Sequence, residues 1–576
     1  MNPPELTRDC AASVIARFLK ARGVDRVFTL CGGHIMPLLV CADREGIRIV
    51  DVRDERAAVH MAQAHAELTG TLGVAFVTAG PGMTNAVTGI ANAHVSRAPV
   101  LVLSGTPPRP QENRGALQDM VHTDLVRTVT RYARTVREPS LVLQELDEAV
   151  SRAMGHGGEP GPAYLDFPTD TLRGEVLPML QLDEYFRPKQ SIPNQPGPKV
   201  IAAAVDLLLS ARRPLVVSGR GARNAGKELL LLLDRLGIPY LDTGESKGLV
   251  PVEHPSFVTA VRGKVMGEAD LVVTIGRRLD FQLAYGSPSV FGEAKFLRIA
   301  DCPSELRDNR RGTVEIFADP ALTLSAIVDA IADREASLDR EWAQGLASEH
   351  KSRAEKLQVS MADAPSDNMG RPHPNRVLHA IQRHLKPDAI VIADGGDFLS
   401  FARVALNGGN YLDPGPFGCL GVGVPYGIAA SLAHPDKQVV VATGDGAFGF
   451  NAMEIDTAVR HGARFLIIVA NNGAWQIEVT DQMQNHPKVV GTRLQFSDHA
   501  AMARSFGMHA ERVERAEDLD AAIERAMERL PALLDVVVTP DAMSSDAKSG
   551  LAWIPDLQAL AAWEQAEQRW RSGKNE

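Results

Sequence analysis

Short apolar runs alternate with longer stretches of helical periodicity along most of the chain. The runs read RVFTLCG, IRIVDVR, GVAFVTAG and PVLVLSG in the first third, RPLVVSGRG, ADLVVTIG and AKFLRIAD in the middle, and AIVIADGG, QVVVATGDG, RFLIIVANN and LLDVVVTP in the last third. Runs that are apolar throughout and separated by helices are typical of parallel sheets covered by helices. The pattern predicts an α/β fold with three open parallel sheets.

Two stretches without periodicity divide the chain. FRPKQSIPNQPGPK (186–199) and MADAPSDNMGRPHPN (361–375) are rich in proline and polar residues, which is typical of linkers. The predicted units are three α/β domains over 1–190, 191–365 and 366–540, followed by a helical C-terminal tail or lid over 541–576.

The two outer thirds share a faint internal repeat. Residues 78–105 and 443–472 both give an apolar run, a Gly-x-Gly triplet, a helical stretch, a short turn and a second apolar run. A duplicated domain would produce this repeat, and so would a chance likeness between two α/β units.

Composition and charge narrow the class of protein. The 576 residues carry a formal charge of -10, which disfavours a nucleic-acid partner. No apolar run approaches the ~20 residues that a membrane span requires. The five cysteines are scattered and form no CxxC pair, so we expect reduced thiols in a cytoplasmic protein.

The strongest chemical signal is the triplet GDG (444–446) at the end of one apolar run, followed by Asn472 at the end of the next. Gly444 and Gly446 let a backbone approach a phosphate closely, and the following helix offers free N–H groups. Asp445 and Asn472 end neighbouring strands, so their oxygens can converge on one Mg²⁺, with the carbonyl of Ala474 as a third ligand. The plainer interpretation is an aspartate that caps a helix and asparagines that make a turn.

This pattern resembles the thiamine-diphosphate-binding motif of the decarboxylase and carboligase superfamily. That superfamily includes acetolactate synthase, benzaldehyde lyase, oxalyl-CoA decarboxylase and the 2-hydroxyacyl-CoA lyases. Other segments agree: DVRDERAAVHMAQAHAELTG resembles the glutamate helix, with Asp54 in place of the usual histidine, and VTAGPGMTNAVTGIANAHVSRAPVLVLSG resembles the pyrimidine-domain signature. The resemblance implies pyrimidine-binding, middle and diphosphate-binding domains, in that order.

The resemblance also implies which residues hold the cofactor. Glu55 matches the glutamate that bonds to the pyrimidine N1′, and Leu420 in GCLGVGVPYGIAAS matches the apolar side chain that bends the cofactor. The expected contacts to thiamine diphosphate are Gly395, Gly396, Asp397, Leu420, Gly444, Gly446, Ala447, Asn472 and Ala474, and those to Mg²⁺ are Asp445, Asn472 and Ala474.

Three further positions are candidates for moving substrate protons. His34 in LCGGHIMPLL matches the active-site histidine of benzaldehyde lyase, and Gln118 matches a glutamine that faces the cofactor. Glu478 lies where pyruvate-decarboxylase-like enzymes carry an acid/base glutamate. A buried carboxyl there would have a raised pKa and could relay protons. A solvated glutamate at a helix start is the plainer alternative.

The middle third resembles segments that bind ADP, or the ADP part of coenzyme A, in oxalyl-CoA decarboxylase. The candidate ligands are Arg220, Arg223, Arg277, Arg278 and Asp301. In acetolactate synthases the same region holds FAD, and a solvated basic surface is the alternative without a ligand. GRGARNAG is not a dinucleotide fingerprint, because its third glycine is misplaced.

The resemblance is closest to bacterial 2-hydroxyacyl-CoA lyases. It implies cleavage of a 2-hydroxyacyl-CoA thioester to formyl-CoA and an aldehyde or ketone. An acetolactate-synthase-like carboligase acting on 2-oxo acids such as pyruvate is the alternative. A regulatory paralogue is disfavoured because Glu55, Asp445 and Asn472 are all present. The family builds its site between subunits, which implies a homodimer at least, and a homotetramer is expected.

Overall fold

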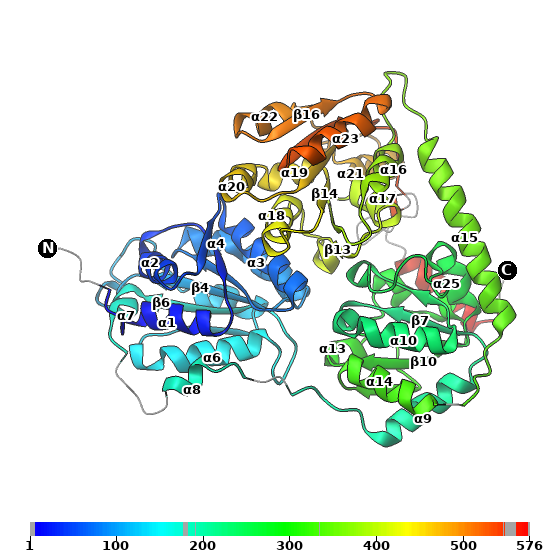
Figure 1. Ribbon diagram of the computed structural model, residues 1–576, viewed down its shortest axis with the longest axis horizontal. Coiled ribbons are helices and arrows are strands. Elements are labelled where there is room, and N and C mark those ends of the chain that lie inside the picture. The colour runs from blue at the N-terminus through cyan, green and yellow to red at the C-terminus, as the bar shows by residue number, and fades with distance from the viewer. Residues whose placement is uncertain are drawn as a thin grey trace.

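The computed structural model describes residues 6–176, 182–189, 192–332, 334–544, 546–547 and 560–573. Three parallel sheets, each flanked by helices, follow one another along these residues (Figure 1). Every ladder between the named strands is parallel. The predicted α/β class with three open sheets is confirmed.

The first sheet has six strands in the order β2-β1-β3-β4-β6-β5. Its strands are β1 (Arg26–Thr29), β2 (Arg48–Asp51), β3 (Gly73–Val77), β4 (Val100–Thr106), β5 (Tyr132–Thr135) and β6 (Ala163–Pro168). Its helices are α1 (Ala11–Ala21), α2 (Met36–Arg44), α3 (Glu55–Thr69), α4 (Pro81–Val95), α5 (His122–Val126), α6 (Val142–Ala153), α7 (Thr169–Arg173) and α8 (Leu182–Phe186).

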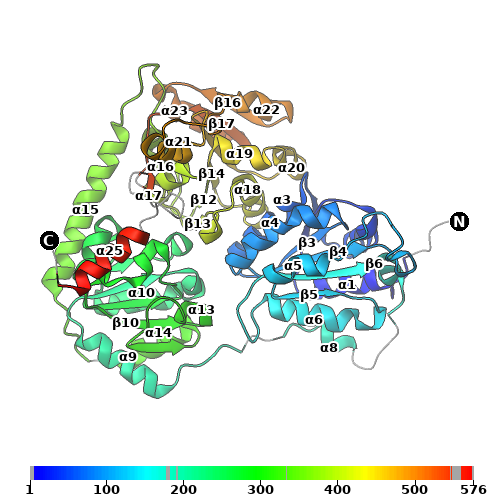
Figure 2. The ribbon, with the colours of Figure 1, turned by 180° about the vertical axis from the view of Figure 1, so that it is seen from behind.

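The middle sheet has five strands in the order β11-β10-β9-β7-β8. Its strands are β7 (Pro214–Ser218), β8 (Tyr240–Leu241), β9 (Leu271–Ile275), β10 (Lys295–Ala300) and β11 (Val314–Phe317). Its helices are α9 (Pro198–Ser210), α10 (Gly226–Leu236), α11 (Arg262–Glu268), α12 (Pro288–Phe291), α13 (Pro303–Leu306), α14 (Pro320–Ile331) and the long α15 (Arg340–Ala362), which leads to the third sheet (Figure 2).

The third sheet repeats the six-stranded order of the first, as β13-β12-β14-β15-β17-β16. Its strands are β12 (Ile390–Asp394), β13 (Asn410–Leu412), β14 (Val439–Gly444), β15 (Leu466–Asn471), β16 (His509–Val513) and β17 (Ala532–Val537). Its helices are α16 (Pro374–His384), α17 (Asp397–Ala405), α18 (Gly423–Ala433), α19 (Asp445–Asn451), α20 (Glu454–His461), α21 (Gln476–Asn485), α22 (His499–Ser505) and α23 (Leu519–Glu528). This common topology agrees with the repeat seen in the sequence.

The first and third domains share one continuous apolar core. Helices α3 and α18 pack against each other between the two sheets, as Figure 1 shows. The core runs from Phe28 and Ala58 on one side to Tyr426 and Val441 on the other. Inside it, the amide of Asn92 donates to the hydroxyl of Tyr426 at 3.0 Å. The shared core fixes the two domains against each other.

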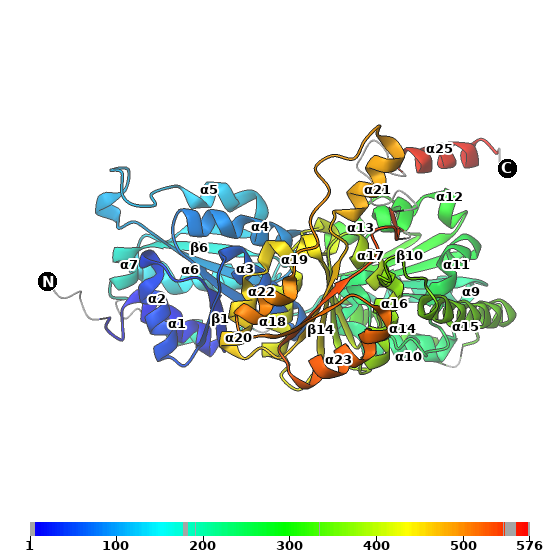
Figure 3. The same cartoon turned by 90° about the horizontal axis from the view of Figure 1, so that it is seen from above.

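The C-terminal tail is helical, as expected. Helix α25 (Leu560–Arg571) packs on α12 and on the 3-10 turn Phe281–Gly286 of the middle domain (Figure 3). Residues 548–559, which lead into α25, lie outside the described part of the chain. Within the described part, no helix is both long and apolar enough to cross a membrane.

Candidate active site

The carboxyl ends of three neighbouring strands of the third sheet gather most of the predicted cofactor residues. Strand β14 lies between β12 and β15, with Asp394 opposite Thr443 and Gly444 opposite Ala470. In such sheets ligands bind beyond the carboxyl ends of the strands. The residues gathered there are Gly395, Gly396, Asp397, Leu420, Gly444, Asp445, Gly446, Ala447, Asn472, Ala474 and Glu478, and all of them line one cavity of about 960 Å³.

Asp445 is a buried carboxylate whose described contacts are to the backbone. It accepts the Gly473 N–H at 3.0 Å, and among the described residues no ion pair joins it to a cationic side chain. Burial raises the pKa of Asp445 to about 7, while the N–H groups of Gly446 and Gly473 oppose this shift. A buried acid with no counter-charge suits a cation, because a bound ion would offset the cost of its charge.

The partners predicted for the same cation lie next to Asp445. Asn472 follows β15 directly, and its Oδ1 accepts the N–H of Ala474 at 3.1 Å. Carboxylate, amide and carbonyl oxygens are the donors that Mg²⁺ prefers. The described residues contain no group of three or more His, Cys, Asp or Glu side chains suited to a metal. A cation here would therefore depend on this mixed set of oxygens.

The two glycines beside Asp445 differ in what surrounds them. A Cβ on Gly446 would lie 2.5 Å from the ring of Trp475, so the start of α19 packs directly on that indole. A Cβ on Gly444 would meet nothing within 4 Å, so this position is open towards the cavity. Trp475 was not predicted as a site residue, although it lies in the NNGAWQIE segment that carries Asn472 and Glu478.

Asp394 is a second residue that sequence reasoning missed. Its carboxylate accepts the N–H groups of Gly395, Gly421 and Gly423 at 2.7, 3.2 and 2.8 Å. Burial raises the pKa of Asp394 to about 6 against these hydrogen bonds. Asp394 thus ties the loop after β12 to the segment that carries Leu420. The sequence did contain a signal for Asp394, because it is an acidic residue at the end of a buried strand.

Glu478 lies in the first turn of α21 and lines the same cavity as Asp445. Burial, with a smaller contribution from Asp481, raises its pKa above the usual value. A raised pKa is expected for a carboxyl group that relays protons. Its role as an acid or base stays a prediction.

The predicted residues of the first domain form a separate cluster. Glu55 is the first residue of α3, and its Oε2 accepts the side-chain amide of Asn85 at 3.1 Å. A Cβ on Gly82 would lie 3.0 Å from Glu55 Oε1, so the backbone of that loop passes close to the carboxylate. Neither Glu55, His34 nor Gln118 lines the cavity that contains Asp445.

His34 and Gln118 lie side by side in this first-domain cluster. His34 occupies the 3-10 turn Gly33–Ile35, and Gly105 lets that turn approach β4, because a Cβ there would lie 2.2 Å from the His34 carbonyl oxygen. Burial lowers the pKa of His34, and the neighbouring Gln118 side chain opposes the shift. Its Nδ1 is buried and has no hydrogen-bond partner among the described residues.

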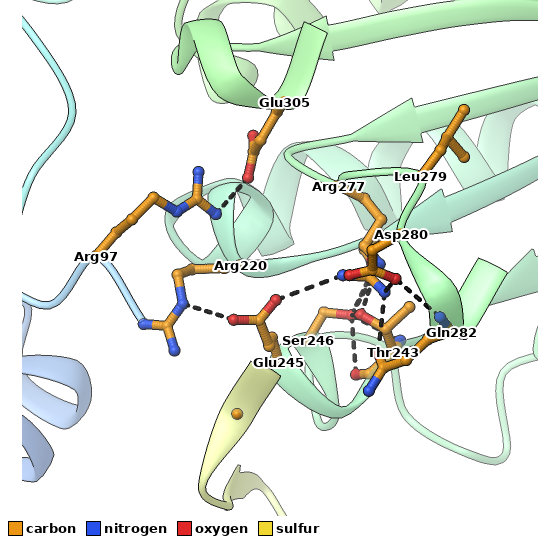
Figure 4. Close-up of polar contacts among 12 residues, drawn as sticks. Arg97, Arg220, Thr243, Glu245, Ser246, Arg277, Leu279, Asp280, Gln282 and Glu305 are labelled. Atoms are coloured by element: carbon orange, nitrogen blue, oxygen red, sulfur yellow. Dashed lines mark hydrogen bonds and ion pairs between the residues drawn. The ribbon is translucent and has the colours of Figure 1, made fainter. Parts of the chain in front are cut away.

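The middle-domain arginines are bonded to carboxylates of the same chain. Figure 4 shows Arg220 paired with Glu245 and Arg277 between Glu245 and Asp280, and it also shows Arg97 of the first domain on Glu305. Arg220 and Arg223 also reach Glu67 of α3, at 3.3 and 2.8 Å. Opposed charges at this distance neutralise each other, so these guanidiniums are not free for phosphates. The prediction that Arg220, Arg223 and Arg277 hold ADP is not supported, and Arg278 and Asp301 are exposed.

The middle domain contributes a different surface to the site. Its residues on the cavity wall combine apolar side chains with cations, and none was predicted from the sequence. They include Lys247, Phe257, Arg262, Phe281 and His350. Lys247 donates to the carbonyls of Arg403 and Leu406 at 2.6 and 2.8 Å, which joins this wall to the end of α17.

Comparison with known proteins identifies all three domains. The N-terminal TPP binding domain, the central domain and the C-terminal TPP binding domain of thiamine pyrophosphate enzymes match residues 10–126, 201–327 and 381–536. The chain is 34% identical to a probable acetolactate synthase of Mycobacterium bovis, over 92% of this chain and 96% of that protein.

Relatives named for a different activity are almost as similar. The chain is 31% identical to 2-hydroxyacyl-CoA lyase 2 of Caenorhabditis elegans, over 89% of this chain and 86% of that protein. It is 29% identical to 2-hydroxyacyl-CoA lyase 1 of Mus musculus, over 92% and 94%. Domain order, glycine loops and overall similarity agree, and the chain belongs to the thiamine-diphosphate-dependent enzyme family.

Proposed function

We propose that this enzyme cleaves the C1–C2 bond of a 2-hydroxyacyl-CoA, giving formyl-CoA and an aldehyde or ketone. Run in reverse, the reaction is an acyloin condensation. Mg²⁺ held by Asp445, Asn472 and Ala474 would anchor the diphosphate of the cofactor. The other residues proposed to hold thiamine diphosphate line the same cavity or, in the case of Glu55, lie in the first domain.

The observation that carries this proposal is the extent of the cavity. It continues from the loops around Asp445 to Phe257, Arg262 and Phe281 of the middle domain, with a volume of about 960 Å³. Such a volume is at the upper end of the range for ligand pockets, and thiamine diphosphate would fill only the part around Asp445, which leaves the middle-domain part for a substrate. An apolar wall with Arg262 suits the pantetheine arm and a phosphate of a CoA thioester.

The residue roles follow from position and charge. Bound thiamine diphosphate supplies a carbon nucleophile that can also accept the electron pair of the broken bond. Glu55 would hold the proton at the pyrimidine N1′. Glu478 would take the proton of the substrate 2-hydroxyl while the C1–C2 bond breaks, because burial raises its pKa and makes it a stronger base than an exposed glutamate.

The separation of the two clusters supports an assembly of at least two chains. Glu55 lies outside the cavity of its own chain, so a partner's diphosphate loop would have to face it. Exposed apolar side chains surround Gln118, notably Leu117 and Val121, and others, such as Met483 and Phe496, follow the diphosphate loops. These surfaces are suited to being covered by a second copy.

An acetolactate-synthase-like carboligase is the second candidate. The similarity to the Mycobacterium bovis protein favours it, and a 2-oxo acid would replace the CoA thioester. Arg220, Arg223 and Arg277 are paired with carboxylates of the same chain, so they do not support ADP binding in the middle domain.

The test loads the purified protein with Mg²⁺ and thiamine diphosphate and offers a series of 2-hydroxyacyl-CoA thioesters or pyruvate. Mass spectrometry of the quenched mixtures measures formyl-CoA and acetolactate, and an absorbance spectrum detects flavin. Formyl-CoA formation supports the lyase. Acetolactate without formyl-CoA, or copurified flavin, supports the carboligase instead.

A pair of variants tests where the CoA part binds. Arg262→Ala changes the cavity wall, whereas Arg278→Ala changes an exposed arginine that does not line it. We expect the first to raise the KM for the thioester about tenfold and the second to leave it unchanged. The reverse result would return the CoA site to the region first predicted from the sequence.

A further inference from the structure

A buried polar chain lies directly behind the candidate proton-handling residues of the first domain. The Nε2 atom of His122 accepts the backbone N–H of Gly80 at 2.9 Å, and its Nδ1 lies 3.1 Å from Oδ2 of Asp166. The hydroxyl of Tyr164 donates to the same Oδ2 at 3.1 Å. His122 and Asp166 are 1% and 0% exposed, so water cannot replace these bonds.

The direction of each hydrogen bond is fixed by the Gly80 amide. A backbone N–H can only donate, so Nε2 of His122 must be an acceptor. The proton of the neutral imidazole is then on Nδ1 and is donated to Asp166. Asp166 thereby holds the ring in the tautomer that can bind Gly80.

Gly80 and Gln118 form an unusually close contact. Gly80 has φ of +61°, and a Cβ on it would lie 2.9 Å from Cβ of Gln118 and 3.2 Å from its Cα. Gln118 itself has φ of +63°, which is uncommon for a residue other than glycine. A residue other than glycine keeps a positive φ only where the surroundings hold it. His122 supplies such a hold through the Gly80 amide.

The residues that this contact positions include the first-domain candidates for proton transfer. The side chain of Gln118 lies beside His34. Two residues beyond Gly80, the backbone of Gly82 passes close to the Glu55 carboxylate. A shift of the Gly80 turn would therefore move Gln118 and disturb the surroundings of Glu55.

We propose that His122, held by Asp166, is a positioning residue that fixes the Gly80 turn and so sets Gln118 against His34. The proposal rests on the proposed function for the role of Glu55, and on the sequence-based prediction that His34 and Gln118 move substrate protons. His122 does not exchange protons with substrate, because it is enclosed between Gly80 and Asp166.

Two substitutions of His122 distinguish its hydrogen bond to Gly80 from its packing in the buried position. In His122→Gln the side-chain oxygen can stand where Nε2 was and accept the Gly80 N–H. In His122→Asn the amide can still donate to Asp166 but is too short to reach Gly80. Both variants remove an imidazole from the same buried position, so each serves as the control for the other.

The experiment measures kcat, KM and thermal unfolding of both variants, with the substrate that the wild-type enzyme accepts. Deuterium exchange of the C2 proton of bound thiamine diphosphate is measured in parallel, because it needs no substrate. We expect His122→Asn to lower kcat and the exchange rate at least about tenfold with little change in KM, and His122→Gln to stay within about threefold of wild type.

Equal losses in both variants, or no loss in His122→Asn, would overturn the proposal, because acceptance of the Gly80 N–H would then not matter. A wild-type enzyme that makes no formyl-CoA would overturn the proposed lyase instead. In that case the effect of the His122 substitutions is still measured, by the turnover of pyruvate or by the C2 exchange rate.

Discussion

The first and third domains share one strand order but place their acidic groups on different elements. In the third domain the loop after β14 carries Asp445 between two glycines. In the first domain the corresponding loop after β3 reads Gly80-Pro81-Gly82 and contains no acid. Its carboxylate, Glu55, comes from the start of α3 instead. The same strand order thus presents one type of loop edge twice, and the two edges differ in the side chains that they carry.

The packing of the two copies explains this division. Helices α3 and α18 occupy corresponding places and lie against each other in the shared core. Glu55 begins α3, and the Leu420 segment leads into α18. Each chain therefore holds Glu55 and the Leu420 segment rigidly with respect to each other. Substitutions in the two copies should have separable effects.

The largest expected effect is that of Glu55→Gln. We expect kcat to fall at least about 100-fold, because an amide cannot hold the proton at the pyrimidine N1′ as a carboxylic acid group does. The amide keeps the size of the side chain and its bond to Asn85. Binding of Mg²⁺ and thiamine diphosphate, measured by calorimetry, should change little. A large loss of cofactor affinity would contradict the division between the domains.

The complementary change is Asp445→Asn. It removes the charge from the third-domain loop, so we expect the affinity for thiamine diphosphate in the presence of Mg²⁺ to fall about tenfold or more. Saturating cofactor should restore part of the activity, unlike in Glu55→Gln. Titration of Mg²⁺ at fixed thiamine diphosphate measures this effect. An unchanged Mg²⁺ dependence would remove Asp445 from the metal site.

Glu454 tests the contact between the two domains. Its buried carboxylate accepts the N–H groups of Arg53 and Asp54 at 3.0 and 3.1 Å, directly before Glu55, and the hydroxyl of Thr457. Burial raises the pKa of Glu454 from 4.5 to about 7. Between these values the folded state holds a proton that the unfolded state has lost, so stability falls as the pH rises.

We expect Glu454→Gln to flatten this decline, since the amide stays neutral and its carbonyl can accept the same N–H groups. The difference in the free energy of unfolding between pH 5 and pH 8 should shrink by up to about 3 kcal/mol. Urea unfolding across this pH range measures it. Parallel curves for the wild type and the variant would show that Glu454 does not titrate there.

The smallest expected effect concerns the start of α19. Gly446→Ala would bring a Cβ to 2.5 Å from the Trp475 ring, and we expect a loss of about 1–3 kcal/mol in the free energy of unfolding. Gly449→Ala in the same helix is the matched control, because its Cβ would meet nothing within 4 Å. The control should be neutral or stabilising by up to about 1 kcal/mol.

The sequence by itself determined the three sheets and the local site motifs. Apolar runs such as 466–471 must be buried, and Gly-x-Gly at a strand end marks a close backbone approach, so both features are encoded by neighbouring residues. For the same reason Asp445, Asn472 and Glu478 could be placed at one edge before the structure was known.

Only the tertiary structure decided which distant groups meet. Glu67 and Arg220 are 153 residues apart, and nothing local in either segment indicates their ion pair. The same holds for the middle-domain wall of the cavity and for His122 behind Gly80. Such contacts depend on how whole domains and loops pack, and a charge that looks free for a ligand in the sequence can be neutralised by a partner that packing brings to it.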